Sequence, residues 1–224
     1  CRHNGIADAI VAASIKAVQP DEAVSRALSG QEFPGRVLLV AAGKAAWQMA
    51  KAAGHNVLLI NQRCHGGSEG HTITFGILEQ RDVLGWIDYV NDRFGKVPVV
   101  LCGVSMGAAT VLMVSGRELP ENVKAVIADC PFDAPSNIIK KVLGQDMGMP
   151  VGIMYPLIRF GGMVYGGFNL NADSPLAAVK NTKLPILLIH GDDDRFVPYQ
   201  MSCNIHAAAP EKIRFHTIRG AGHA

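Results

Sequence analysis

The segment at residues 103–107, Gly-Val-Ser-Met-Gly, is the part of this chain best suited to chemistry. It follows an apolar run at residues 97–102 and precedes a helix-compatible stretch at residues 108–115. A serine between two glycines at a strand-to-helix junction occupies a tight, strained turn that exposes its hydroxyl above the sheet edge. We therefore expect Ser105 to act as a nucleophile.

Two later segments carry the partners that a nucleophilic serine needs. A histidine must accept the hydroxyl proton, and a carboxylate must fix the tautomer of that histidine. Residues 190–198 (HGDDDRFVP) follow one apolar run and contain three aspartates, Asp192, Asp193 and Asp194. Residues 220–223 (GAGH) follow another apolar run and end in His223. The order Ser, Asp, His, each after its own predicted strand, is typical of alpha/beta hydrolases.

Six short apolar runs predict the strands that must position these residues. The runs resemble the buried strands of a parallel sheet, and they cover residues 37–41, 57–60, 97–102, 125–128, 186–189 and 213–218. Helical patterns lie between them, the clearest at residues 76–94, and Gly95 is placed to end that helix. The alternation predicts an α/β fold with a mostly parallel sheet and helices on both faces. Ligands of such sheets bind beyond the carboxyl ends of the strands, where Ser105 is expected.

The segment at residues 131–175 interrupts this alternation. It is rich in glycine, methionine and aromatic residues and is too apolar for a solvated loop. Two interpretations stay open together: ordinary packing of two or three short helices, and a lid insertion with an adaptable apolar pocket.

Composition favours one domain over residues 1–224 and excludes several function classes. Of the 224 residues 49% are hydrophobic and 18% charged, and the formal net charge of +2 gives no reason to expect a nucleic acid partner. Five scattered cysteines match neither a disulfide framework nor a metal motif, which predicts reduced thiols and a cytoplasmic location. No apolar run approaches the roughly 20 residues of a membrane span, and no secretory signal is recognised. The oligomeric state is left open.

From about residue 54 to its end the chain resembles bacterial alpha/beta-hydrolase esterases of the serine-aminopeptidase and lysophospholipase-like group. The resemblance rests on residues 63–68 (RCHGGS, with Cys64 where the family has glycine), 103–107, 190–198 and 220–223. It implies that Asp194 is the acid and His223 the base. Asp192 and Asp193 are the alternatives for the acid, and turn chemistry favours them as residues that cap the loop. It also implies that His65 and His190 are structural loop histidines.

The reaction expected from these residues is acyl transfer. Ser105 attacks an ester or similar carbonyl with His223 as general base, and water then cleaves the acyl-enzyme. One oxyanion donor should be the backbone N–H of Met106, and a second should come from the loop after the first strand, at Ala42. The expected partner is a small-molecule acyl substrate, and the chemistry needs neither a metal nor a cofactor.

The front of the chain departs from the hydrolase pattern. The first loop of these hydrolases usually carries a His-Gly pair, but residues 41–44 here read AAGK. Residues from about 5 to 53 resemble the N-terminal start of bacterial glycerate kinases, notably in GRVLLVAAGKAA at residues 35–46. We interpret the chain as a chimera joined near Gly54, with residues 1–53 integrated into the sheet. A natural fusion and a misassembled sequence are the alternatives.

Two other functions follow from this front segment. A replaced oxyanion loop predicts a catalytically weak or inactive scaffold with a vestigial triad. Gly43 and Lys44 at a helix start offer N–H groups and an ammonium to phosphate, as phosphoryl transfer requires. A solvent-facing Lys44 is the favoured interpretation, because the segment lacks the P-loop pattern.

Overall fold

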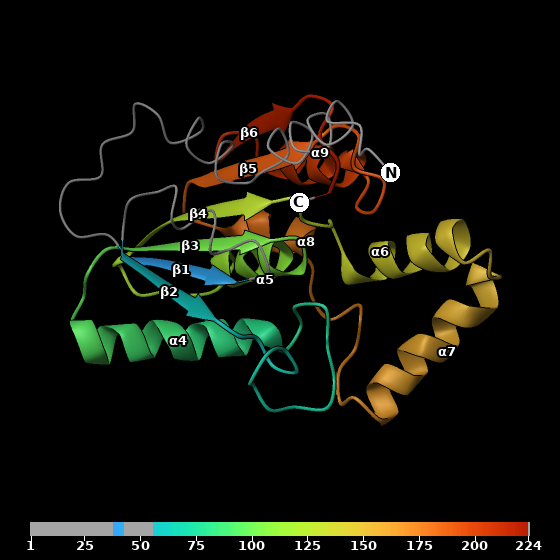
Figure 1. The fold of residues 1–224 in the computed structure, drawn as a ribbon, viewed down its shortest axis with the longest axis horizontal. Helices are drawn as coiled ribbons and strands as arrows, with labels where there is room; N and C mark the ends of the chain where they lie inside the picture. The colour runs from blue at the N-terminus through green and yellow to red at the C-terminus, as the bar shows by residue number, and fades with distance from the viewer. Residues whose placement is uncertain (1–37, 43–55, 224) are drawn as a thin grey trace, which may run out of the picture.

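The computed structural model describes residues 38–42 and 56–223, which form a six-stranded parallel sheet (Figure 1). The strand order is β2-β1-β3-β4-β5-β6. The strands are β1 (Leu38–Ala42), β2 (Asn56–Ile60), β3 (Val99–Val104), β4 (Val123–Asp129), β5 (Ile186–Gly191) and β6 (Ile213–Ile218). The α/β class and all six predicted strands are thereby confirmed. Because every pair is parallel, the carboxyl ends of all strands share one edge.

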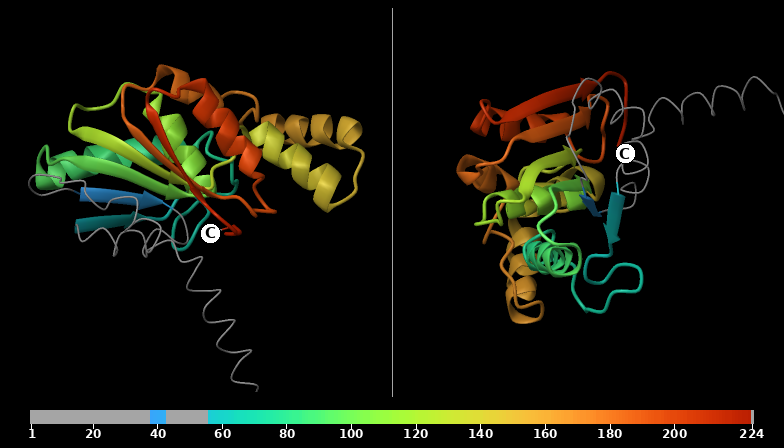
Figure 2. Two further views of the ribbon diagram at one scale, coloured as in Figure 1. Left: turned by 90° about the horizontal axis from the view of Figure 1, so that it is seen from above. Right: turned by 90° about the vertical axis from the view of Figure 1, so that its left-hand side faces the viewer.

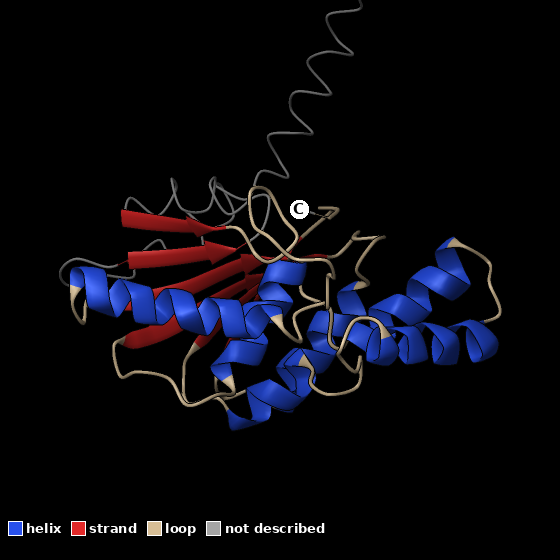
Figure 3. Cartoon of the chain, turned by 90° about the horizontal axis from the view of Figure 1, so that it is seen from below, coloured by secondary structure: helices blue, strands red, loops and turns tan. Residues whose placement is uncertain are grey.

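Four helices cover one face of this sheet (Figure 3). They are α4 (Glu79–Phe94), α5 (Met106–Ser115), α8 (Pro175–Asn181) and α9 (Tyr199–Ala208). Side chains such as Ile87, Leu112 and Ile205 join strand residues such as Leu101 and Leu188 in one buried apolar cluster. Lys44 and most of the segment 1–53 lie outside the described residues. Within that segment β1 is described, and it pairs with both β2 and β3.

Helix α4 begins three residues later than the sequence pattern predicts, because a buried carboxylate organises the turn before it. Glu79 is fully buried and accepts hydrogen bonds from the backbone N–H of Thr74 at 2.7 Å and of Gly76 at 2.9 Å. The Thr74 hydroxyl donates to the same carboxylate. This turn holds Phe75 in a left-handed conformation, with φ at 55°.

The insertion between β4 and α8 is helical, as one of the two interpretations predicts. It contains α6 (Pro135–Lys141), a π-helical turn η1 (Val142–Asp146) and α7 (Val151–Val164). These helices extend from the carboxyl-end side of the sheet (Figures 1 and 2). Among the residues that the structure describes, no helix is both long and apolar enough to cross a membrane.

Gly103 is required by the close approach of β3 to the start of α5. A Cβ atom at this position would lie 2.3 Å from the carbonyl carbon and oxygen of Gly107, both backbone atoms that cannot move aside. We expect Gly103→Ala to lower the free energy of unfolding by about 3 kcal/mol or to prevent folding. Gly85 in α4 is the matched control, because a Cβ there meets nothing within 4 Å. Gly85→Ala should stabilise the helix by about 0.5–1 kcal/mol in urea unfolding. If the two variants unfolded at the same urea concentration, the close approach of β3 to α5 would not be what requires Gly103.

Candidate active site

Ser105 lies on the sharp turn that its glycine neighbours predict. It follows the last residue of β3 and caps α5, with φ at 55° and ψ at −116°, a conformation that is strained for a residue with a side chain. Two backbone bonds hold the turn: the Ser105 N–H donates to the Asp129 carbonyl at 2.8 Å, and its carbonyl accepts from Ala109 at 3.0 Å. The hydroxyl is thereby fixed at the carboxyl edge of the sheet.

Asp194 lies in the loop after β5 with a side chain that is 0% exposed. Its Oδ1 accepts the backbone N–H groups of Phe196 and Val197, each at 2.9 Å. Asp192 and Asp193 are exposed, and Asp192 instead accepts the N–H of Gly220 at 2.6 Å. The three neighbouring aspartates therefore occupy different environments, and only Asp194 is oriented inward.

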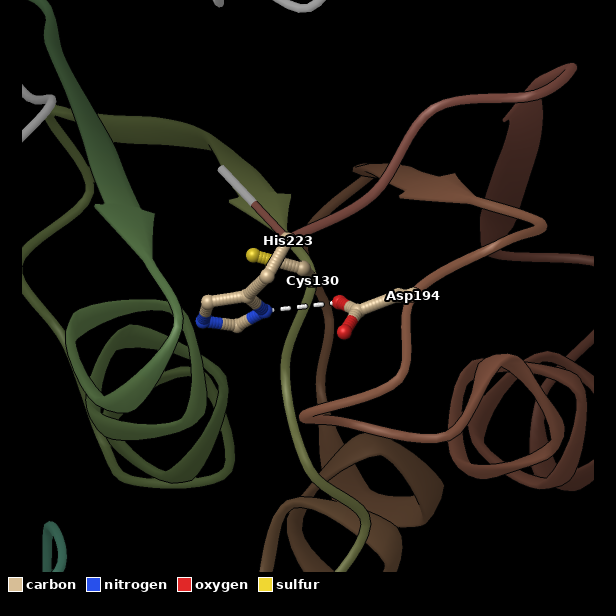
Figure 4. Close-up of side chains that lie close together, drawn as sticks. All are labelled: Cys130, Asp194 and His223. Carbon is tan, nitrogen blue, oxygen red and sulfur yellow. Dashed lines mark hydrogen bonds and ion pairs between the residues drawn. The ribbon is translucent and has the colours of Figure 1, made fainter.

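His223 joins Asp194 to Ser105. Its Nδ1 lies 2.7 Å from Asp194 Oδ2 and its Nε2 lies 2.9 Å from Ser105 Oγ (Figure 4 shows the contact with Asp194). An ionised carboxylate only accepts hydrogen bonds, so Nδ1 carries the proton and Nε2 accepts from the serine hydroxyl. The side chains of Ser105, His223 and Asp194, which the sequence predicts as site residues, are thus joined by consecutive hydrogen bonds.

The loop that carries Asp194 packs closely against the loop that carries His223. A Cβ at Gly191 would lie 2.3 Å from the Ala221 carbonyl oxygen. The Asp193 N–H donates to that oxygen at 3.0 Å. The ring of Phe196 meets the His223 ring edge-on, with centroids 5.0 Å apart. These contacts bring together residues 29 positions apart in the chain.

The pKa of Asp194 lies well below its ordinary value. Burial acts to raise this pKa, but hydrogen bonds from His190, His223 and the Val197 backbone outweigh it. The carboxylate therefore stays ionised at neutral pH, which is the state that stabilises a protonated His223.

His190 is a further residue in contact with Asp194, which the sequence did not predict. It does not lie in a loop, as expected, but within β5, and it is 0% exposed. Its Nε2 lies 3.2 Å from Asp194 Oδ2 and 3.0 Å from the Val197 carbonyl, and its Nδ1 lies 2.6 Å from Ser202 Oγ. Because the first two partners are acceptors, Nε2 carries the proton and Nδ1 accepts from Ser202. One feature of the sequence could have indicated this position: His190 is a polar residue at the end of an otherwise apolar strand.

Asp129, at the end of β4, is a second buried carboxyl group beside these residues. Burial raises its pKa to about 6, while His190 and His223 act in the opposite direction. Because the folded pKa lies above the unfolded one, the folded state loses stability as the pH rises from about 4 to about 6.

We expect Asp129→Asn to remove this pH-dependent loss. The variant should be more stable than the parent at about pH 7.5, by up to about 3 kcal/mol, and equal to it at about pH 4. Urea unfolding at both pH values measures the difference. The exposed Asp92 provides the control, since Asp92→Asn should follow the parent at both. If Asp129→Asn changed the free energy of unfolding by the same amount at both pH values, the raised pKa of Asp129 would be contradicted.

The two expected oxyanion donors lie at different points of the sheet edge. Met106 is the first residue of α5, so its N–H has no acceptor within the helix. Ala42 is the last residue of β1 and pairs with Gly103 in β3. Residues 43–55, which follow Ala42, lie outside the described part of the chain.

The loop at residues 63–68 is fixed by an ion pair to α4. The Arg63 guanidinium donates to both carboxylate oxygens of Asp82, at 2.8 Å and 2.6 Å. His65 is bonded within its own loop, with Nδ1 2.8 Å from the Arg63 carbonyl. The Arg63 contact thus joins the loop to α4, and the His65 contact lies within the loop.

The chain belongs to the alpha/beta hydrolase fold family, whose sequence profile matches residues 39–152. The match begins inside the segment compared above with glycerate kinases and runs across Gly54. It therefore gives no support to a glycerate kinase origin or to a chimera joined near Gly54. Of residues 1–53 the structure describes residues 38–42 alone.

Curated relatives match up to about four fifths of the chain. YqkD, an uncharacterized protein of Bacillus subtilis, is 30% identical over 146 residues, covering 65% of this chain and 48% of YqkD. The chain spans about half the length of the curated relatives it matches.

Solved structures share the fold at low sequence identity. The esterase Pf2001 of Pyrococcus furiosus superposes with a TM-score of 0.61 at 20% identity, covering 84% of this chain and 75% of the esterase. The acylaminoacyl peptidase of Pyrococcus horikoshii gives 0.58 at 18% identity, covering 87% of this chain and 34% of the peptidase. At these identities the likeness concerns the fold.

Proposed function

We propose that this chain is a serine hydrolase that cleaves a carboxylic ester or a related acyl bond of a small molecule. The observation that carries the proposal is the row of contacts from Ser105 through His223 to Asp194, at 2.9 Å and 2.7 Å. Family membership and the esterase and peptidase neighbours in fold support the same reaction class.

The geometry supports a two-step acyl transfer. Nε2 of His223 takes the Ser105 proton as Oγ attacks the carbonyl carbon, and the ionised Asp194 stabilises the imidazolium. His223 then protonates the leaving group, and an acyl-enzyme remains on Ser105. A water molecule, deprotonated by the same Nε2, attacks the acyl carbon and releases the acid.

The negative oxygen that forms during each attack needs hydrogen-bond donors. We assign one to the Met106 N–H, which adjoins the nucleophile and has no helical acceptor. We assign the second to the end of β1 at Ala42, which the register places beside Gly103. Loss of one such donor commonly costs about 10²–10³ in rate.

The helical insertion at residues 131–175 supplies a candidate acyl-binding surface. Its buried side chains, including Phe132, Leu143 and Tyr155, share an apolar cluster with Ala109 of α5 and Val197 of the Asp194 loop. Met106 packs against this cluster. We propose that the insertion acts as a lid whose inner face binds the acyl chain, since methionine and aromatic side chains adapt to varied ligands.

Labelling with a fluorophosphonate probe tests the proposal directly. The probe should modify the folded parent at Ser105 and leave Ser105→Ala unlabelled, because only an activated serine reacts. The half-buried Ser68 offers the matched control, because its hydroxyl donates to the Asn61 carbonyl and has no contact with His223. Ser68→Ala should label like the parent. Absence of labelling in the folded parent would count decisively against a serine nucleophile. Labelling with very slow ester turnover would favour the weakly active scaffold.

A further inference from the structure

Three potential metal ligands meet beside the proposed nucleophile. The Cys130 sulfur, a carboxylate oxygen of Asp194 and a ring nitrogen of His223 all lie within 4.8 Å of one another (Figure 4). Thiolate, imidazole and carboxylate are the ligands that Zn²⁺ takes in proteins, at about 2.0–2.3 Å from the metal. Only a small contraction around an ion is needed to bring all three into range. No motif in the sequence indicates this cluster, because its members come from three separate segments.

The backbone holds two of these groups in place before any ion binds. Cys130 follows β4 in a left-handed conformation, with φ at 44°, and its N–H donates to the Ile189 carbonyl at 2.9 Å. The Asp194 carboxylate is fixed by the two N–H groups described above. Both residues are buried, whereas the His223 side chain is 23% exposed and marks the side from which an ion can enter. Three protein ligands and an open side match a site whose fourth position is taken by water.

We infer that Cys130, Asp194 and His223 form an inhibitory site for a soft divalent cation such as Zn²⁺ or Cd²⁺. A thiolate ligand selects these ions over Mg²⁺ and Ca²⁺, which prefer oxygen.

Inhibition follows from the tautomer that the metal imposes, and this part of the inference rests on the proposed function. Nδ1 of His223 faces Asp194, so this nitrogen coordinates the ion through its lone pair. The ring proton then moves to Nε2, where it points at Ser105 and leaves no lone pair to accept the serine proton. The Cys130 thiol releases its proton to solvent as the metal–sulfur bond forms. Neither ring nitrogen can then serve as a base.

Titration with Cd²⁺, followed by the ultraviolet absorption of the cadmium–thiolate bond, tests the site without any measurement of hydrolysis. The titration is run on the Ser105→Ala background, in which the three ligands are intact. We expect one strongly bound Cd²⁺, with affinity reduced at least about 100-fold in Cys130→Gly. Glycine suits the positive φ at this position, so this variant should fold, and Cys130→Ser provides a second test.

Cys203→Ser on α9 is the matched thiol control and should bind Cd²⁺ like its parent. Cys1 and Cys64 are present in every variant, so the difference between titrations isolates Cys130. With the active parent, Zn²⁺ should suppress ester turnover reversibly and Mg²⁺ should not. Identical Cd²⁺ titrations for Cys130→Gly and its parent would overturn the inference. If the parent hydrolysed no ester, the Cd²⁺ titration would still test the metal site. If no Cd²⁺ bound, the metal site would be refuted and the serine hydrolase proposal would be unaffected.

Discussion

Replacement of His223 by alanine should lower kcat by about 10⁵-fold. The Nε2 atom lies 2.9 Å from Ser105 Oγ, and we propose that it accepts the hydroxyl proton. The members of such a triad act as one unit. Without this base the serine keeps its proton at neutral pH, so fluorophosphonate labelling of Ser105 should be lost along with ester turnover. Initial-rate kinetics with a chromogenic ester measures the first effect, and mass spectrometry of the probe adduct measures the second.

His71 provides the matched control for this experiment, because it is an exposed histidine in the loop before α4. His71→Ala should retain kcat within about twofold, since surface substitutions away from a site rarely matter. If His223→Ala kept more than about a hundredth of the parent kcat, another base would have to serve Ser105.

Replacement of Asp194 by asparagine should lower kcat by about 10⁴-fold. The carboxylate holds the proton of His223 on Nδ1 at 2.7 Å, and an amide at this position permits the opposite tautomer, which cannot accept from Ser105. The amide also no longer stabilises the imidazolium that forms during attack. The loss should appear in kcat more than in KM, because it concerns the transition state.

The same substitution has a stability effect with a defined pH dependence. The pKa of Asp194 is lowered in the folded state, so its carboxylate contributes stability above its ordinary pKa, and this contribution is lost as the pH falls below about 4. Asp194→Asn should therefore be less stable than the parent at neutral pH, with the gap narrowing in acid. The exposed neighbour Asp193 is the control, and Asp193→Asn should match the parent in both assays. Equal kcat values for the two variants would remove Asp194 from the proposed mechanism.

Much of this molecule follows from local features of its sequence. Short apolar runs predict six parallel strands, since a strand buried on both faces must be apolar along its whole length. The serine turn between β3 and α5 is equally local, because a glycine at position 103 is needed where β3 meets the first turn of the helix. Chain order and parallel topology then place Ser105, Asp194 and His223 at one edge of the sheet.

Other features depend on contacts between distant segments. The choice among three adjacent aspartates is decided in space by backbone N–H groups and by two histidines, one of them 29 residues away. In the sequence, only the family resemblance favours Asp194 over Asp192 and Asp193 as the acid.

The sequence does not show which side chains lie beside His190, Asp129 and Cys130. A histidine or cysteine in an apolar strand is most often ordinary core, and its chemistry depends on which side chains burial brings beside it. Local propensity determines which residues form strands and turns. Only the packed tertiary structure determines which polar groups lose water together, and that loss of water sets their hydrogen bonds and pKa values.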